Sequence, residues 1–185
     1  MQQAEQPLVS AAEVVEFWRQ AGRPRWFRKD ENFDRRFREK CLATHEAAVR
    51  GELSSWAADA IGALALVLLL DQFPRNAFRG TPRAFATDAM ARSVADDALR
   101  RGLDQQIPED LRHFFYLPFS HSENLTDQQR AVELTGALGS DADYHARQHR
   151  EIIERFGRFP HRNPVLGRSS TPEELAYLAE GGFAG

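Results

Sequence analysis

An almost unbroken apolar run at residues 61–70 constrains the fold more than any other feature of this 185-residue chain. It lies within residues 55–73, a segment without proline that is apolar nearly all round a helical circumference at its centre. A helix of that kind is normally the buried centre of its domain. The run is also only about half as long as the ~20 residues that a membrane span needs. We therefore expect a central buried helix in a soluble protein, without a membrane partner.

Helix start signals recur along the whole chain, whereas strand signals are nearly absent. Capping boxes, in which Ser or Thr is followed three residues later by Glu or Gln, begin at Ser10, Thr126 and Thr171. Asp30 and Thr87 are further candidates for N-cap residues. The remaining helices are expected to start near residues 55, 108 and 140.

These signals predict an all-α fold of about eight helices, stacked as antiparallel pairs in the manner of a short solenoid. The chain contains no Gly/Ser linker and no low-complexity tract, so we expect residues 1–185 to form a single helical domain. Residues 1–9 and 181–185 are expected to be frayed tails.

Composition and charge exclude several classes of protein. The net charge of −3 and the pI of about 6.1 argue against a nucleic-acid partner. Cys41 is the single cysteine, so no internal disulfide forms, and its place in a predicted helix favours burial as a small apolar residue. Residues 1–10 lack the features of a signal peptide, which favours a cytoplasmic location. No cofactor is expected, and the oligomeric state is not indicated.

Two segments that follow predicted helices have nearly the same sequence. The first corner, residues 73–82, begins Phe-Pro-Arg-Asn, and the second corner, residues 159–172, begins Phe-Pro-His-Arg-Asn. In both, the residue before proline is expected to leave the helical conformation. The corners and their flanks concentrate basic and amide side chains: Arg75, Asn76, Arg79, Arg158, His161, Arg162, Asn163 and Arg168. They are interpreted either as structural corners or as an arginine site that binds an anionic ligand.

Asp71 directly follows the apolar run, at the end of the most buried helix. A carboxylate there needs a partner if it is desolvated, and Arg75 or Arg79 is the expected one. Such a pair is typical both of binding sites and of ordinary structural ion pairs.

His121 and Glu123 follow the proline that is expected to interfere with the helix starting near residue 108. Adjacent residues of an extended chain point apart, so the His-Ser-Glu sequence at 121–123 does not form a local catalytic triad. A hydrolase is therefore not favoured on this evidence.

His149 lies on a predicted helix that leads into the second corner. Asp141, His145 and His149 share one face at i, i+4 and i+8, a spacing at which two imidazoles can hold zinc. The Glu of the metalloprotease helix motif is missing, so a solvated face is favoured and no metal is expected. His149 is instead expected to face the same cavity as the second corner.

Several of these stretches together resemble one known family. They are WFRKD at 26–30, LLLDQFPRN at 68–76, GTPRAFATD at 80–88, HFFYLPF at 113–119 and HREIIERFGRFPHRN at 149–163. The chain is similar, over about residues 13–178, to the uncharacterised bacterial family known as domain of unknown function 924. The resemblance implies an all-α fold like tetratricopeptide superhelices, and it implies no activity.

Two hypotheses for the function follow. The first is a non-catalytic binding module whose pocket, lined by Arg and His, holds an anionic small molecule or a peptide. The alternative is an enzyme that acts on a phosphate- or carboxylate-bearing small molecule with His and Glu as acid–base groups. The candidate ligand-binding residues are Asp71, Arg75, Asn76, Arg79, His121, Glu123, His149, Arg158, His161, Arg162 and Asn163.

Overall fold

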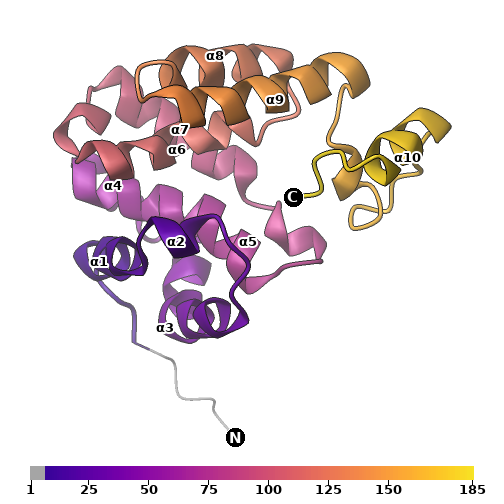
Figure 1. Ribbon diagram of the computed structural model, residues 1–185. Coiled ribbons are helices and arrows are strands. Elements are labelled where there is room, and N and C mark those ends of the chain that lie inside the picture. The colour runs from indigo at the N-terminus through magenta and orange to yellow at the C-terminus, as the bar shows by residue number, and fades with distance from the viewer. Residues whose placement is uncertain (1–6) are drawn as a thin grey trace, which may run out of the picture. The chain divides into compact units, whose positions relative to one another are not determined.

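The computed structural model describes residues 7–185 (Figure 1). The chain divides into two compact units. The N-terminal unit comprises Met1–Arg79 and Arg83–Pro118, and the C-terminal unit comprises Gly80–Pro82 and Phe119–Gly185. Residues 7–185 contain helices and no strand, so the all-α prediction is confirmed. The tetratricopeptide-like stacking and the single domain stay predictions. In the described part of the chain no helix is long and apolar enough to cross a membrane.

The N-terminal unit is built from helices of very different lengths. They are α1 (Ala11–Ala21), α2 (Arg23–Trp26), α3 (Glu31–Val49), α4 (Ala60–Val67), α5 (Phe73–Ala77), α6 (Asp88–Arg100) and most of α7 (Glu109–Ser120). The boundary between the units falls within α7, after Pro118. The expected interruption at that proline is wrong, since Pro118 lies inside α7 and the helix continues for two residues beyond it.

The apolar run forms the centre of the N-terminal unit, as predicted. Helix α4 packs against α1 and α6, and its Leu64 is fully buried. One member departs from the pattern, because Ile61 is 40% exposed. Gly62 allows α4 to approach the preceding 3₁₀ turn closely, since a Cβ there would lie 2.0 Å from the carbonyl oxygen of Trp56.

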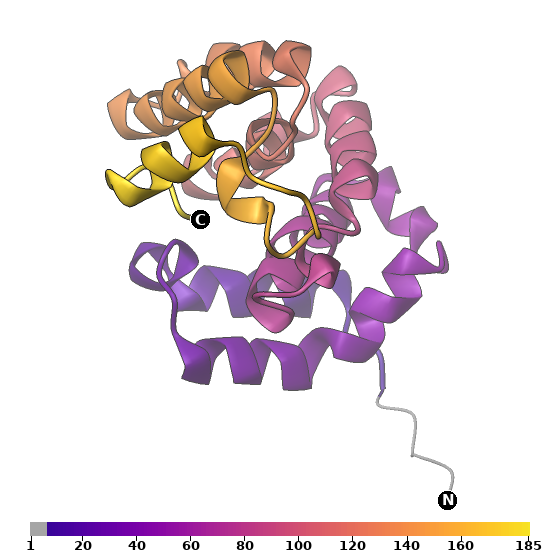
Figure 2. The ribbon, with the colours of Figure 1, turned by 90° about the vertical axis from the view of Figure 1, so that its right-hand side faces the viewer.

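Aromatic side chains fill the space between α1 and α3, which lie side by side in Figure 2. Phe17 stacks on Phe33 and on Phe37, with ring centroids 5.5 and 5.3 Å apart. Cys41 follows on the same buried stripe of α3, and burial raises the pKa of its thiol to about 12. This confirms the prediction that Cys41 is a buried apolar residue.

The first corner does not leave the helix where Phe-Pro was expected to end it. Residues Leu68–Gln72 form a π-helical turn, in which the backbone N–H of Phe73 donates to the carbonyl of Leu68, and α5 follows without an extended residue. The wider π turn leaves room for Pro74 in a helical segment. It also leaves backbone carbonyls without a helical donor. Side chains supply those donors, since His45 Nδ1 lies 2.8 Å from the Leu69 carbonyl oxygen and the Thr87 hydroxyl donates to the Leu70 carbonyl oxygen.

The predicted helix starts are right in most places. Ser10 and Thr171 form complete capping boxes, and Asp30 accepts two backbone N–H bonds at the start of α3. Thr87 does occupy an N-cap position, but its hydroxyl is turned to the π turn instead of capping α6. The capping box expected at Thr126 is wrong. The side chain of the residue two positions earlier, at 124, caps that helix.

The C-terminal unit contains α8 (Leu125–Thr135), α9 (Ser140–Phe156) and α10 (Pro172–Ala179). Helices α8 and α9 lie side by side, and Figures 1 and 2 show both in orange. After α9 the chain passes through the second corner, where Phe159 is extended as predicted and residues Pro160–Arg162 form a 3₁₀ turn that packs against α10.

The structure describes all of the predicted C-terminal tail but only part of the predicted N-terminal tail. Most of residues 1–9 lies outside the described chain, although the backbone N–H of Val9 donates to Thr44 Oγ1 of α3. At the other end, the backbone N–H of Phe183 donates to the Tyr177 hydroxyl at 2.9 Å, so the segment 181–185 makes a specific contact.

Candidate functional site

The first corner places Arg75 between two carboxylates of the N-terminal unit. Asp71 is fully buried, and its Oδ1 lies 3.2 Å from Nη1 of Arg75. The same guanidinium donates to both oxygens of Asp88, at 2.7 and 2.9 Å, and to the backbone carbonyl of Asp71. Gln72 donates to Asp71 as well, at 2.7 Å. This confirms the expectation that the Asp71 carboxylate has an arginine partner.

Asn76 and Arg79 converge on a residue that the sequence reasoning missed. Asp34 of α3 accepts from Asn76 Nδ2 at 2.6 Å and from Arg79 Nε at 2.6 Å. It is only 9% exposed. Its position beside Phe33, on the buried stripe of α3, was the one available signal, because a carboxylate there must find partners.

Beside this cluster the surface of the N-terminal unit is hollowed. The α3 hollow, as we name it, has a volume of about 400 Å³. It is lined by Lys29, Glu31, Asp34, Arg35, Arg38, Asn76, Ala77 and Arg79. A second one, the α2 hollow, has a volume of about 660 Å³ and is lined by Ala21, Pro24, Arg25, Arg28, Lys29 and Asp30. Both are therefore rich in cations, and of the predicted site residues Asn76 and Arg79 line the α3 hollow.

Three arginines of these hollows are held less firmly by carboxylates than the arginines of the corners, although the charge of Arg28 acts on Asp30. Arg28, Arg35 and Arg38 form no salt bridge with any residue of the described chain, and all three are exposed. Arg35 donates to the side chain of Asn32 at 2.8 Å. Arg38 makes a long contact, 3.5 Å, with the carbonyl of Ala77. The sequence signal for them was the concentration of basic residues around the start of α3, which the predictions did not use.

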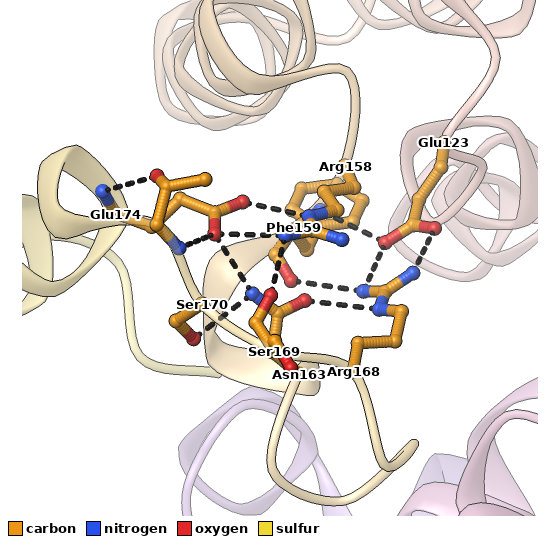
Figure 3. Close-up of polar contacts among 9 residues, drawn as sticks. Glu123, Arg158, Phe159, Asn163, Arg168, Ser169, Ser170 and Glu174 are labelled. Carbon is orange, nitrogen blue, oxygen red and sulfur yellow. Dashed lines mark hydrogen bonds and ion pairs between the residues drawn. The ribbon is translucent and has the colours of Figure 1, made fainter.

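The second corner forms a network of charged side chains within the C-terminal unit (Figure 3). Arg158 donates to both oxygens of Glu174, at 2.7 and 2.9 Å. Asn163 donates to the same carboxylate at 3.1 Å, and the backbone N–H of Thr171 donates to it at 2.8 Å. These hydrogen bonds, above all those from Arg158, lower the pKa of Glu174 to about 2. Glu174 thus caps α10 and also holds the corner, a second role that its capping-box position did not reveal.

The other half of this network joins Glu123 to Arg168. Arg168 donates to both oxygens of Glu123, at 2.8 and 2.9 Å, and its Nε donates to Asn163. The backbone N–H of Phe159 donates to Glu123 at 2.8 Å. Burial raises the pKa of Glu123, but the hydrogen bonds from Arg168 and Phe159 outweigh it and the pKa is lowered. We name the whole set, Glu123, Arg158, Asn163, Arg168 and Glu174, the corner network.

The remaining candidates of the C-terminal unit gather around two aromatic rings. The ring of His149 lies 5.5 Å from that of Phe159 and 4.7 Å from that of Phe183, measured between centroids. His161 lies 5.0 Å from the same Phe183 ring. Phe183 was missed, although an apolar residue just beyond the glycines that end a helix commonly packs back against the protein.

Burial dominates the chemistry of His149. It lowers the pKa of this histidine to about 3, and the neighbouring charge of His121 adds to the effect, whereas a hydrogen bond to the Ser120 backbone opposes it. Its ring is therefore neutral at pH 7. Arg162 is only 7% exposed, donates to the carbonyl of His121 at 3.0 Å, and places its guanidinium 4.5 Å from the centre of the Phe159 ring.

The predicted residues thus fall into separate groups, each held by partners within its own unit. Asp71 and Arg75 form one group, and Asn76 and Arg79 form another. The C-terminal unit contains the remaining candidates, namely His121, Glu123, His149, Arg158, His161, Arg162 and Asn163. Among residues 7–185 no three His, Cys, Asp or Glu side chains come together as a metal site would require.

Comparison with known proteins identifies a family and a similar solved structure, both of unknown function. A family model described as "Bacterial protein of unknown function (DUF924)" matches residues 14–182. The solved structure of ATU0120, a protein of unknown function from Agrobacterium tumefaciens, is similar at 56% sequence identity with a TM-score of 0.91. The match covers 92% of this chain and 97% of that one. No curated protein matches significantly. The chain belongs to the bacterial family of unknown function DUF924.

Proposed function

We propose that the protein binds an anionic small molecule in the α3 hollow of its N-terminal unit. The observation that carries the proposal is that Arg35 and Arg38 line a hollow of about 400 Å³ and form no salt bridge with the described residues. Guanidinium groups bind carboxylates and phosphates bidentately, and here two of them share a helix face at i and i+3. The volume is within the usual range for small-molecule sites.

The arginines of the two corners are less suited to a ligand, because the protein has already neutralised them. Arg158 and Arg168 each bind both oxygens of a carboxylate, and Arg75 binds Asp88 in the same way. A ligand at any of these guanidinium groups would have to displace a carboxylate that is largely withdrawn from solvent. Breaking such a pair costs about 3–5 kcal/mol when it is fully buried. A ligand of Arg35 and Arg38 avoids that cost.

Hydrogen bonds among Asp34, Asn76 and Arg79 preorganise part of the lining of the α3 hollow. Asp34 holds Arg79 by a hydrogen bond of 2.6 Å to Nε, which fixes the position of a third cation at the edge of the cavity. Both oxygens of Asp34 are occupied by Asn76 and Arg79, which offsets its repulsion of an anion. Rigid donors of this kind reduce the entropy that binding must overcome.

The enzyme alternative has weaker support from the geometry. Its acid–base candidate Glu123 has both carboxylate oxygens bound by Arg168, so any proton transfer through it would disrupt the corner network. His149 is neutral at pH 7 and is a weak base with a pKa of about 3. We therefore propose binding without catalysis. The cytoplasmic location, like the superhelical stacking, stays a prediction.

A titration series tests the proposal. Phosphorylated and carboxylated metabolites are first screened by thermal shift, and isothermal titration calorimetry then gives affinities for the hits, for inorganic phosphate and for citrate. We expect Arg38→Ala to weaken binding about tenfold, because one charge-assisted contact is lost. Arg100→Ala is the matched control, since Arg100 is also an exposed arginine of the N-terminal unit but is paired with Asp96 on α6.

Two results would overturn the proposal: no anion binds to the wild-type protein, or Arg38→Ala and Arg100→Ala bind with the same affinity as the wild type. If acidic peptides bind through Arg38 and small anions do not, the surface is a peptide site instead.

A further inference from the structure

The α2 and α3 hollows share one side chain, and this connection indicates the kind of ligand. Lys29 lines both, and it lies in the turn that joins α2 to α3. The two cavities therefore adjoin one another within the N-terminal unit, with volumes of about 660 and 400 Å³. Together they are large for a single phosphate or carboxylate group and fit a molecule of the size of an ordinary metabolite.

Each hollow contains its own arginine that forms no salt bridge with the described residues. Arg28 lines the α2 hollow and Arg38 lines the α3 hollow, and neither forms a salt bridge with a described residue. Arg38 follows the first residue of α3 by seven positions, which at 1.5 Å per residue places its Cα about 10 Å along the helix axis from the turn that carries Arg28. The two arginines therefore belong to different parts of the backbone, and each lines a different hollow.

Lys29 is available to bridge them. Among the described residues its salt bridge is with Glu31, at 3.5 Å, and the two side chains are 67% and 84% exposed. An exposed pair of this kind contributes little stability, so a ligand can replace Glu31 at small cost.

The acidic residue of the α2 hollow is already engaged. Asp30 accepts the backbone N–H groups of Asn32 and Phe33 as the N-cap of α3, and it lies 3.7 Å from Arg25. Its charge therefore opposes an anion less than a solvated carboxylate would. Arg28 forms no salt bridge with a described residue, although its charge acts on Asp30 from a longer distance.

We infer that the ligand carries two anionic groups, one bound by Arg28 in the α2 hollow and the other by Arg35 and Arg38 in the α3 hollow. Lys29 contacts the segment between them. The inference rests on the proposed function and adds to it the class of ligand, a doubly anionic elongated small molecule. Phosphate and carboxylate ends share the required chemistry, and the probes below distinguish them.

The test is a length series. Affinities of linear α,ω-bisphosphonates and α,ω-dicarboxylates, with two to twelve methylene groups, are measured by isothermal titration calorimetry beside methylphosphonate and acetate. We expect the affinity to pass through a maximum at the chain length that spans the two hollows, with the more strongly bound series identifying the end group. Arg28→Ala and Arg38→Ala should each weaken the optimal probe about tenfold, while Arg28→Ala should leave binding of methylphosphonate to the α3 hollow unchanged.

The outcomes separate the two proposals. If neither the single-ended nor the double-ended probes bind, the proposed function fails together with this inference. If both kinds bind through Arg38 but affinity does not depend on length, or if Arg28→Ala leaves the optimal probe unaffected, only the inference of a doubly anionic ligand is wrong. Arg19→Ala controls for the general loss of one positive charge, because Arg19 is an exposed arginine of α1 that is paired with Glu16.

Discussion

His149 makes the stability of the C-terminal unit sensitive to acid. Its pKa is about 3 in the folded protein, chiefly because of burial, and it returns to about 6.5 when the chain unfolds. Between those values the unfolded state binds one more proton than the folded state, so the free energy of unfolding falls as the pH falls. The slope is about 1.4 kcal/mol per pH unit. At pH 4.5, His149 alone therefore removes roughly 3 kcal/mol of the stability that is fully present above pH 7.

The measurement is urea unfolding of the wild type and of His149→Gln, followed by circular dichroism at intervals from pH 7.5 to pH 4.5. Other groups titrate in this range, so the readout is the free energy of unfolding of the wild type minus that of His149→Gln. This difference should fall by about 3 kcal/mol between pH 7.5 and pH 4.5. The charges that act on His149, those of His121, His145 and Arg162, are present in both proteins. His145→Gln removes an exposed neighbour on the same helix but keeps the buried imidazole, so its stability should follow that of the wild type more closely than the stability of His149→Gln does. Parallel stability curves for the wild type and His149→Gln would refute the reasoning.

Two further substitutions test hydrogen bonds that stabilise the corners, one in the corner network and one at the π turn. Glu174→Gln should lower the melting temperature by about 5 °C, because it leaves Arg158 without its carboxylate. Glu173→Gln, on the same helix turn, should change the melting temperature little. Equal effects of the two substitutions would contradict the role given to Glu174. Thr87→Val, which removes the hydroxyl that satisfies a carbonyl of the π turn, should cost about 2 kcal/mol in chemical unfolding. A neutral result there would mean that the carbonyl of Leu70 finds another donor.

The helices could be predicted because their signals are local. A capping box needs only four consecutive residues, and Ser10 and Thr171 were identified correctly for that reason. The error at Thr126 has a local cause as well, since Asn124 is an equally good N-cap two residues earlier. The buried centre at residues 61–70 followed from composition alone.

The continuation of the helix through Pro74 could not be predicted, because it depends on distant partners. The carbonyl groups that the π turn releases are satisfied by His45 and Thr87, which lie 24 and 17 residues from the carbonyls they contact. Proline normally ends or kinks a helix because it provides no donor and crowds the preceding turn. A local rule applied at Phe73 therefore failed, whereas the same rule succeeded at Phe159, where the extended conformation is present.

The candidate site also depends on partners that are distant in the sequence, so local patterns could not predict it. The sequence reasoning concentrated on arginines that the protein uses internally, because a pattern such as Phe-Pro-Arg-Asn does not reveal whether a carboxylate is nearby. Glu174 lies 16 residues from Arg158, and Glu123 lies 45 residues from Arg168. The α3 hollow depends on the approach of α3 to the end of α5, where Arg38 reaches a carbonyl 39 residues away. Only the folded chain separates paired arginines from unpaired ones.

The most direct test of the account is a crystal structure of the protein with the bisphosphonate of optimal length. We predict one phosphonate within hydrogen-bond distance of Arg35 or Arg38 in the α3 hollow and the other beside Arg28, with Lys29 between them. The corner network should be unchanged, with Arg158 still bound to Glu174. Density for the ligand at the second corner, in place of the Glu174 carboxylate, would contradict the account.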